Sequence, residues 1–267
     1  MSHQLINEGN PRSGKIQGIT YNGWTITSKK ASICNSAEME GIQKNFGIPP
    51  PEMVFGNNYV KIQKGAFEYT WNAYEALSKV DTSENSSEHI KVSYASEWTK
   101  KSNHQNVKDI IKPYDWTYST DYKGTIAFKN DWEKVEEPVI DVDRLKQKEP
   151  ILFYDENILY EDELADNGTA MLSLRMRVMP SCFLILQRFF LRVDDVLFRI
   201  NDTRVYHEFG SPYLVREYTS KEQSYYSIKK NLYGRDISLL NDQNWVSSVF
   251  SSDVKTLERH TIKLDDK

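Results

Sequence analysis

The chain has 267 residues, with 34 Lys and Arg against 38 Asp and Glu, so its formal net charge is only −4. This length suffices for one large domain that buries a core without disulfides. The balanced charge argues against a surface that follows nucleic-acid phosphates, and no stretch reaches the roughly 20 apolar residues of a membrane span. The two cysteines, Cys34 and Cys182, come with no apolar leader, which indicates a reducing compartment. We therefore expect a cytoplasmic protein, with the nucleus as a second location, that acts on neither nucleic acid nor membrane.

In the first half of the chain, turn residues separate short periodic segments. The first ten or so residues are polar and are followed closely by Pro11 and Gly14, which favours a mobile N-terminal arm. From about Tyr21 the pattern predicts a strand at 24–27, a helix at 36–46 capped by Ser36, strands at 59–63 and 67–71, and a helical turn capped by Asn72.

The second half contains the clearest strands. Alternating apolar residues from Thr169 to Val178 predict a half-buried strand, and the apolar run from Cys182 to Val193 predicts a strand buried on both faces. Asp194 and Asp195 mark a turn, after which further strands return antiparallel up to about residue 218. This meander is the expected core.

These segments set the fold class and the domain organisation. Helical periodicity in the first half and successive strands in the second predict an α+β fold, one domain with an antiparallel β-sheet core and flanking short helices. We place a mobile arm at 1–20, the domain at 21–220, and a C-terminal extension at 221–267 that packs on the domain in part.

Motifs for nucleotide and metal binding occur only in incomplete form. Residues 9–16 follow the pattern G-x-x-x-x-G-K, but Ile16 stands where a phosphate loop needs Ser or Thr for Mg²⁺. The five histidines are scattered, and His207-Glu208 does not continue to H-E-x-x-H because Ser211 takes the second ligand position. The sequence therefore predicts no metal and no cofactor.

A cluster of acidic residues follows the middle of the chain. Its members are Asp155, Glu156, Glu161, Asp162, Glu163 and Asp166. Paired carboxylates can act as general acid and base or bind a cation. Because the spacing of a calcium loop is absent, we favour a solvated face or a partner surface for arginines.

Residues 111–124 hold four aromatic and two acidic residues. Pro113 restricts the segment to an extended shape. Every second residue then lies on one side, which brings together Tyr114, Trp116 and Tyr118. Two interpretations are equally open: an aromatic ladder that seals the sheet, or the wall of a peptide-binding cleft in which Asp115 or Asp121 orients the peptide.

Arginine and lysine are segregated along the chain. Seven arginines lie between Arg175 and Arg216, whereas no lysine occurs from Glu149 to Ser220. The planar guanidinium group pairs with carboxylates and stacks on aromatic faces in ways that an ammonium group cannot replace. This segment is therefore suited to recognise carboxylates.

Seven blocks of the sequence occur in an order that resembles a known family. They are Pro51–Asn58, Ile111–Thr125, Tyr160–Leu164, Arg177–Ser181, Arg188–Asp194, Arg199–Glu208 and Arg216–Ser220. Together they are similar to the TIPRL, or TIP41-like, family of TOR-signalling regulators. The resemblance extends from about Tyr21 to Ser220 and fades on either side.

The resemblance implies a non-enzymatic protein with an α+β fold and a cleft. Such proteins bind catalytic subunits of type 2A-like Ser/Thr protein phosphatases, in part through the C-terminal tail of that subunit. The family is also linked to TOR signalling and to the alpha-four (Tap-forty-two) phosphatase-associated protein. By position, its phosphatase contacts fall on Glu75, Ile140, Ile200 and Asp202. Glu75 stands where the animal pattern has Asp, and Ile200 where it has Met, so both keep the chemical type.

The arginines and the aromatic segment fit such a partner, because a phosphatase tail presents a free carboxylate after aromatic and apolar residues. We expect Arg199 and Arg204 to supply positive charge and Asp202 to orient a donor. The remaining residues of the expected cleft are Tyr114, Asp115, Trp116, Tyr118 and Tyr206.

Two other classes of function stay open. A hydrolase that uses Asp115, Asp121 or His207 would turn over a substrate and lose that turnover with these residues. A general peptide-binding module would bind acidic aromatic tails indiscriminately, which salt dependence and competition between tail peptides would reveal.

Overall fold

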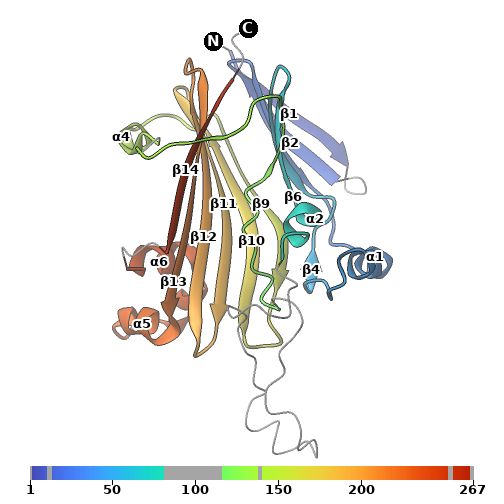
Figure 1. The fold of residues 1–267 in the computed structure, drawn as a ribbon, viewed down its shortest axis with the longest axis vertical. Coiled ribbons are helices and arrows are strands. Elements are labelled where there is room, and N and C mark those ends of the chain that lie inside the picture. Colours follow the sequence, from blue (N-terminus) through green and yellow to red (C-terminus); the bar gives the residue numbers. More distant parts are fainter. Residues whose placement is uncertain (1, 11–13, 81–115, 138–139, 252–254, 265–267) are drawn as a thin grey trace, which may run out of the picture.

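The computed structural model describes residues 2–10, 14–80, 116–137, 140–251 and 255–264. Within these residues, two antiparallel sheets enclose a common core, and short helices lie beside them (Figure 1). The predicted α+β class with an antiparallel core and short flanking helices is confirmed. The division of the strands into two sheets is what the structure adds.

The first sheet has six strands in the order β1-β2-β3-β5-β6-β7. Their bounds are Gln4–Asn10 (β1), Gly14–Tyr21 (β2), Trp24–Lys30 (β3), Tyr59–Lys64 (β5), Phe67–Asn72 (β6) and Thr125–Ala127 (β7). In β6 buried aromatic residues alternate with half-buried polar ones, and in β3 the buried residues Trp24, Ile26 and Ser28 alternate in the same way. That alternation is typical of strands with one face on a core.

The second sheet has eight strands in the order β4-β9-β10-β11-β12-β13-β14-β8. Their bounds are Met53–Val54 (β4), Glu133–Lys134 (β8), Phe153–Asp162 (β9), Gly168–Val178 (β10), Cys182–Val193 (β11), Leu197–Glu208 (β12), Tyr213–Ser224 (β13) and Thr256–Lys263 (β14). The predicted turn joins β11 to β12, and Asp195 in it has a left-handed backbone, φ 60°. Aspartate tolerates that conformation better than most residues do.

The helices are short. Beside the first sheet lie α1 (Ser36–Phe46) and α2 (Ala73–Leu77); beside the second lie α4 (Val142–Lys146), α5 (Tyr225–Lys229), η1 (Lys230–Leu232), η2 (Ile237–Asn241) and α6 (Gln243–Val249). The N-cap of α1 is Asn35, one residue before the expected Ser36, because Asn35 and Glu38 form a reciprocal capping box. None of the helices in the described ranges is long and apolar enough to cross a membrane.

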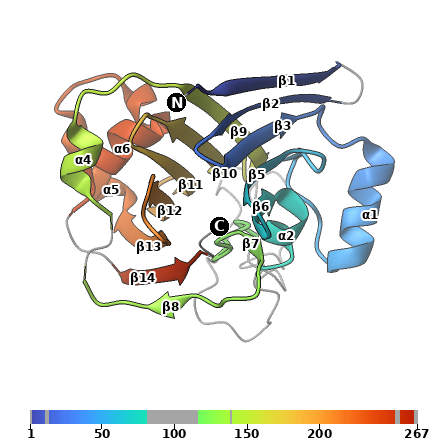
Figure 2. The ribbon, with the colours of Figure 1, turned by 90° about the horizontal axis from the view of Figure 1, so that it is seen from above.

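The main core fills the space between the two sheets, while α4, α5 and α6 cover the opposite face of the second sheet (Figure 2). Trp24 of the first sheet and Phe183 of the second meet edge to face, with ring centroids 5.0 Å apart. We call the side of the second sheet that faces the first sheet its inner face, and the side under the three helices its outer face.

The N-terminal residues do not form the expected mobile arm. β1 and β2 pair from Gln4↔Thr20 to Asn10↔Gly14, and β2 pairs with β3 from Lys15↔Lys30 to Tyr21↔Trp24. Ile19 of β2 is fully buried in the main core. The polar composition misled the prediction, because β1 is exposed on both faces and depends on strand pairing for its structure.

The C-terminal residues contribute a strand to the second sheet. β13 continues past residue 220 to Ser224, and β14 pairs with it from Tyr213↔Lys263 to Ser220↔Thr256. The helices between these two strands pack on the outer face of the same sheet. Where the structure describes them, residues 221–264 thus either belong to the second sheet or pack on its outer face.

Candidate functional site

β12 carries five of the eleven predicted site residues and presents them on two opposite faces of the second sheet. Val205 belongs to the main core on the inner face, whereas Ile200 belongs to a cluster with α5 and α6 on the outer face. Because side chains alternate along a strand, Arg199 lies on the inner face and Arg204 on the outer face. The structure therefore does not bring the two expected charge donors together.

Arg199 is bound within the chain on the inner face. Its Nη2 lies 2.7 Å from Oε2 of Glu222, and its Nη1 donates to Oγ of Ser119 at 2.8 Å. Only 14% of its side chain is exposed. Its charge is compensated by the chain itself.

The described part of the aromatic segment is buried. Trp116 and Tyr118 belong to the main core. The hydroxyl of Tyr118 donates to the carbonyl of Pro50 at 3.3 Å, and the Tyr160 hydroxyl donates to the carbonyl of Tyr118 at 2.8 Å. For these two residues the placement is that of a seal over the sheet. Tyr114 and Asp115 lie outside the described residues.

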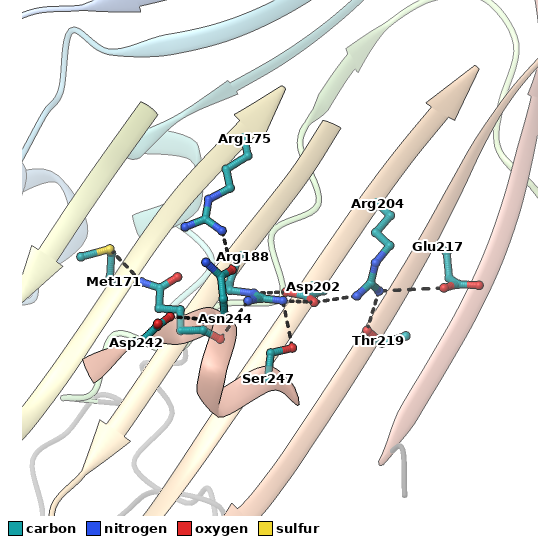
Figure 3. A network of polar contacts seen from close by, with 11 residues as sticks. Met171, Arg175, Arg188, Asp202, Arg204, Glu217, Thr219, Asp242, Asn244 and Ser247 are labelled. Carbon is teal, nitrogen blue, oxygen red and sulfur yellow. Dashed lines mark hydrogen bonds and ion pairs between the residues drawn. The ribbon is translucent and has the colours of Figure 1, made fainter. Parts of the chain in front are cut away.

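Asp202 is the centre of a polar network on the outer face (Figure 3). Its two carboxylate oxygens accept from Nε and Nη2 of Arg188 at 2.7 and 2.8 Å, and Oδ2 also accepts from Nη2 of Arg204 at 2.8 Å. The side chains of Arg188 and Asp202 are 7% and 4% exposed. Bidentate pairing fixes both groups in position, so the chain itself orients Asp202.

Arg204 extends this network toward β13. Its Nη1 donates to Oγ1 of Thr219 at 3.2 Å and lies 3.9 Å from the carboxylate of Glu217. About a third of its side chain, 31%, is exposed. Of the two predicted arginines, Arg204 is the more accessible.

Tyr206 and Ile140 pack together on the outer face, in a cluster that also contains Met179, Cys182 and Val215. Both side chains are buried. Burial raises the pKa of the Tyr206 hydroxyl, and the nearby Cys182 adds to that rise. Tyr206 therefore stays protonated and serves packing in this conformation.

Glu75 lies beside the first sheet, in the first turn of α2. Its backbone N–H donates to the side chain of Asn72, the N-cap, at 2.9 Å. Its exposed side chain lines a hollow of about 500 Å³ together with Lys79, Asp121 and Lys123. The other three predicted phosphatase contacts, in contrast, pack in the clusters and the network of the outer face.

The residues of the hydrolase interpretation have different surroundings. His207 is 1% exposed and packs against Trp24 and Phe183, and burial lowers its pKa to about 4. The side chain of Asp121 is 71% exposed, and Asp115 lies outside the described residues. Within the described ranges, no group of three or more His, Cys, Asp and Glu side chains is placed to hold a metal ion.

The acidic cluster divides between two ion pairs and a hollow, and one of the pairs joins Asp155 to Lys30. Glu156 pairs with Arg175 at 3.1 Å, as expected for a partner of the arginines. A hollow of about 450 Å³ beside Arg192 is lined by Glu161, Glu163 and Asp166. Burial raises the pKa of Glu161, and the charge of Glu163 adds to the rise.

Sequence reasoning missed Arg188, although a signal for it exists. The turn at 194–195 fixes the register of the β11–β12 hairpin, and that register places Arg188 opposite Asp202. The contacts of α6 with this pair could not be found in the same way. Ser247 accepts from Nη2 of Arg188 at 3.2 Å, but no local sequence pattern links the two residues.

Comparison with known proteins identifies relatives across most of the chain. The model of the TIP41-like family matches residues 53–229. A TIP41-like protein of Homo sapiens is 44% identical over 213 residues, covering 78% of this chain and 77% of that protein. The type 2A phosphatase activator tip41 of Schizosaccharomyces pombe is 37% identical over 237 residues, covering 87% of this chain and 93% of that protein. The type 2A phosphatase activator TIP41 of Saccharomyces cerevisiae is 39% identical over 253 residues, covering 86% and 70%.

Proposed function

The chain belongs to the TIP41-like family, and from this premise we propose that it binds the catalytic subunit of a type 2A-like Ser/Thr protein phosphatase and regulates its activity. The observation that carries the proposal is the similarity to two yeast proteins named type 2A phosphatase activators, over 86–87% of this chain. We further propose that the protein is a non-enzymatic regulator in TOR signalling and that alpha-four is a second partner.

The proposed phosphatase contacts differ in accessibility. Glu75 is exposed at the hollow beside α2, so a partner can reach its carboxylate directly. Ile140, Ile200 and Asp202 are 8%, 3% and 3% exposed. In this conformation they hold the outer face together, and Glu75 is the contact that can be tested without disturbing the core.

The phosphatase tail needs a cation for its terminal carboxylate, and we assign that role to Arg204. Its guanidinium is partly exposed on the outer face. Within the chain it contacts Thr219 and the carboxylates of Asp202 and Glu217. Guanidinium groups pair with carboxylates in a bidentate geometry. Arg199 is less suited, because only 14% of its side chain is exposed, against 31% for Arg204.

The contact role of Glu75 is tested by charge reversal. We expect Glu75→Arg to weaken binding of a purified type 2A catalytic subunit by about tenfold, or about 1.4 kcal/mol, with unchanged thermal stability. Glu40→Arg is the matched control, because Glu40 is an exposed glutamate on α1. Equal affinity of both variants would remove Glu75 from the interface. If the unaltered chain neither binds the subunit nor changes its activity, the proposed function is wrong.

The tail proposal has its own test. A catalytic subunit that lacks its last few residues should bind the chain more weakly than the intact subunit, and Arg204→Gln should bind both forms equally. If truncation leaves the affinity for the unaltered chain unchanged, the tail does not contribute.

A further inference from the structure

Residues 225–250 form a flap inserted between two neighbouring strands. The flap leaves β13 after Ser224, and the chain re-enters the sheet at β14, whose first residue, Thr256, pairs with Ser220 of β13. Both ends of the flap are therefore fixed by adjacent strands. The pairing of β13 with β12 and with β14 includes no residue of the flap. Most of it also lies beyond residue 229, where the match to the family model ends.

The flap has little structure that can stand alone. Its four helical pieces, α5, η1, η2 and α6, have five, three, five and seven residues. Isolated helices shorter than about 12–15 residues are marginal in water. The shape of the flap therefore depends on its contacts with the outer face.

A row of polar contacts attaches α6 to the second sheet (Figure 3). Nη1 of Arg188 donates to the carbonyl of Gln243 at 3.2 Å, and Nη2 donates to Oγ of Ser247 at 3.2 Å. Nη1 of Arg175 donates to Oδ1 of Asn244 at 2.7 Å. Apart from the Arg188–Asp202 pair beneath them, these are contacts between neutral acceptors and arginines, which water can replace at modest cost.

The surface beneath the flap has the composition of a binding surface. Phe190, Phe198 and Ile200 are at most 3% exposed and pack with apolar residues of all four helical pieces. The Arg188–Asp202 pair lies directly beside them. Aromatic residues and arginine are the side chains most enriched in the centres of protein interfaces. The same surface continues to Arg204, which is partly exposed.

We propose that the flap is an internal competitor for the phosphatase: closed, it covers this surface, and opened, it lets the catalytic subunit dock on Phe198, Ile200 and the Arg188–Asp202 pair. This inference rests on the proposed function. It accounts for the burial of Ile200 and Asp202, two of the proposed contacts. A partner that binds only the open form shifts the population toward it, and its apparent affinity falls with the fraction that is open.

Two substitutions on the flap change this equilibrium in opposite directions without altering the docking surface. Asn244→Asp keeps the shape of the side chain but gives Arg175 a charged acceptor at the first turn of α6, which stabilises the closed flap. Val246→Asp places a charge at a fully buried position of α6 and opens the flap. Ser248→Asp is the matched control, because it adds the same charge at an exposed position of the same helix.

The test combines amide hydrogen exchange over residues 225–250 with the affinity for a purified type 2A catalytic subunit, using the full chain throughout. We expect Asn244→Asp to slow exchange and weaken binding about threefold, and Val246→Asp to speed exchange and strengthen binding about tenfold. Ser248→Asp should match the unaltered chain. If Val246→Asp fails to fold, Asn244→Asp decides the matter.

Exchange that slows in Asn244→Asp with no change in affinity would overturn the inference, and so would weaker binding by a folded Val246→Asp. Both of these outcomes leave the proposed function in place, since the unaltered chain still binds. If the catalytic subunit binds neither the unaltered chain nor any of the variants, the proposed function is wrong, and so is the docking role of the covered surface.

Discussion

Asp202 occupies a position at which one carboxylate orders two arginines and, through one of them, the helix α6. Its carboxylate receives hydrogen bonds from Arg188 and Arg204, and Arg188 in turn donates to α6. Taking a charge out of water is costly unless a partner compensates it. The intact buried pair therefore adds little net stability, but removal of one of its two partners leaves an uncompensated buried charge and is strongly destabilising. A variant at Asp202 that loses phosphatase binding is informative only if its folded fraction is known.

The first prediction follows from this constraint. Asp202→Asn leaves the Arg188 guanidinium buried without a counter-charge, so the free energy of unfolding should fall by about 3–5 kcal/mol, as measured by urea denaturation. Glu217→Gln is the control, because Glu217 pairs with arginines that are partly exposed, and it should cost less than about 1 kcal/mol. Equal losses of unfolding free energy in the two variants would mean that the Arg188–Asp202 pair is no more costly to disrupt than a partly exposed pair.

At the scale of elements, the sequence predicted those strands whose side chains alternate against a core. β10 is of this kind, whereas β11 was predicted from a continuous apolar run and β12 from the turn that precedes it. The helix α1 was also predicted, and its end at Gly47 follows from the left-handed backbone that glycine adopts there, φ 71°. The opposite faces of Arg199 and Arg204 were also predictable, because an odd separation along a strand reverses the face. The attachment of α6 was not, since Arg175 and Asn244 are 69 positions apart and meet only through the tertiary fold.

The sequence did not predict β1 and β2, because their side chains lack the apolar alternation that marks a strand. Six of the seven residues of β1 are exposed, so no apolar alternation marks the strand. β2 contributes one fully buried residue, Ile19, between polar and glycine neighbours. β2 pairs with the row of backbone groups that β3 offers, and β1 pairs in turn with β2.

Truncation distinguishes a built-in hairpin from an arm. Deletion of residues 1–13 removes β1 and should lower the melting temperature only slightly, because β1 buries little. Deletion of residues 1–21 also removes Ile19 and the partner of β3, and should cost about 2–5 kcal/mol, seen as a much lower melting temperature. Equal melting temperatures of the two truncated chains would restore the interpretation of residues 1–20 as an arm.

At the scale of the whole molecule, one core joins two sheets, and aromatic residues from both sides fill it. His207 lies at this junction, between Trp24 of β3 and Phe183 of β11. Its Nδ1 lies 2.9 Å from the carbonyl of Tyr213, to which a neutral imidazole can donate. The outer face is covered by α4 and the flap, so a partner of the second sheet has to approach around or beneath these helices.

Because His207 lies between the two sheets, we expect the stability of their packing to fall in acid. His207 has a pKa of about 4 in the folded protein, lowered mainly by burial, against 6.5 as its ordinary value. Between pH 6.5 and pH 4, His207 is therefore protonated in the unfolded chain and neutral in the folded chain. The free energy of unfolding keeps its full value above pH 6.5 and decreases as the pH falls from 6.5 to 4. Urea denaturation at pH 7 and pH 4 should show that the unaltered chain loses about 2–3 kcal/mol more than His207→Asn. His3→Asn, at an exposed position, should retain the full loss. If His207→Asn loses as much as the unaltered chain, the acid sensitivity arises from other groups and the two sheets are not coupled through this histidine.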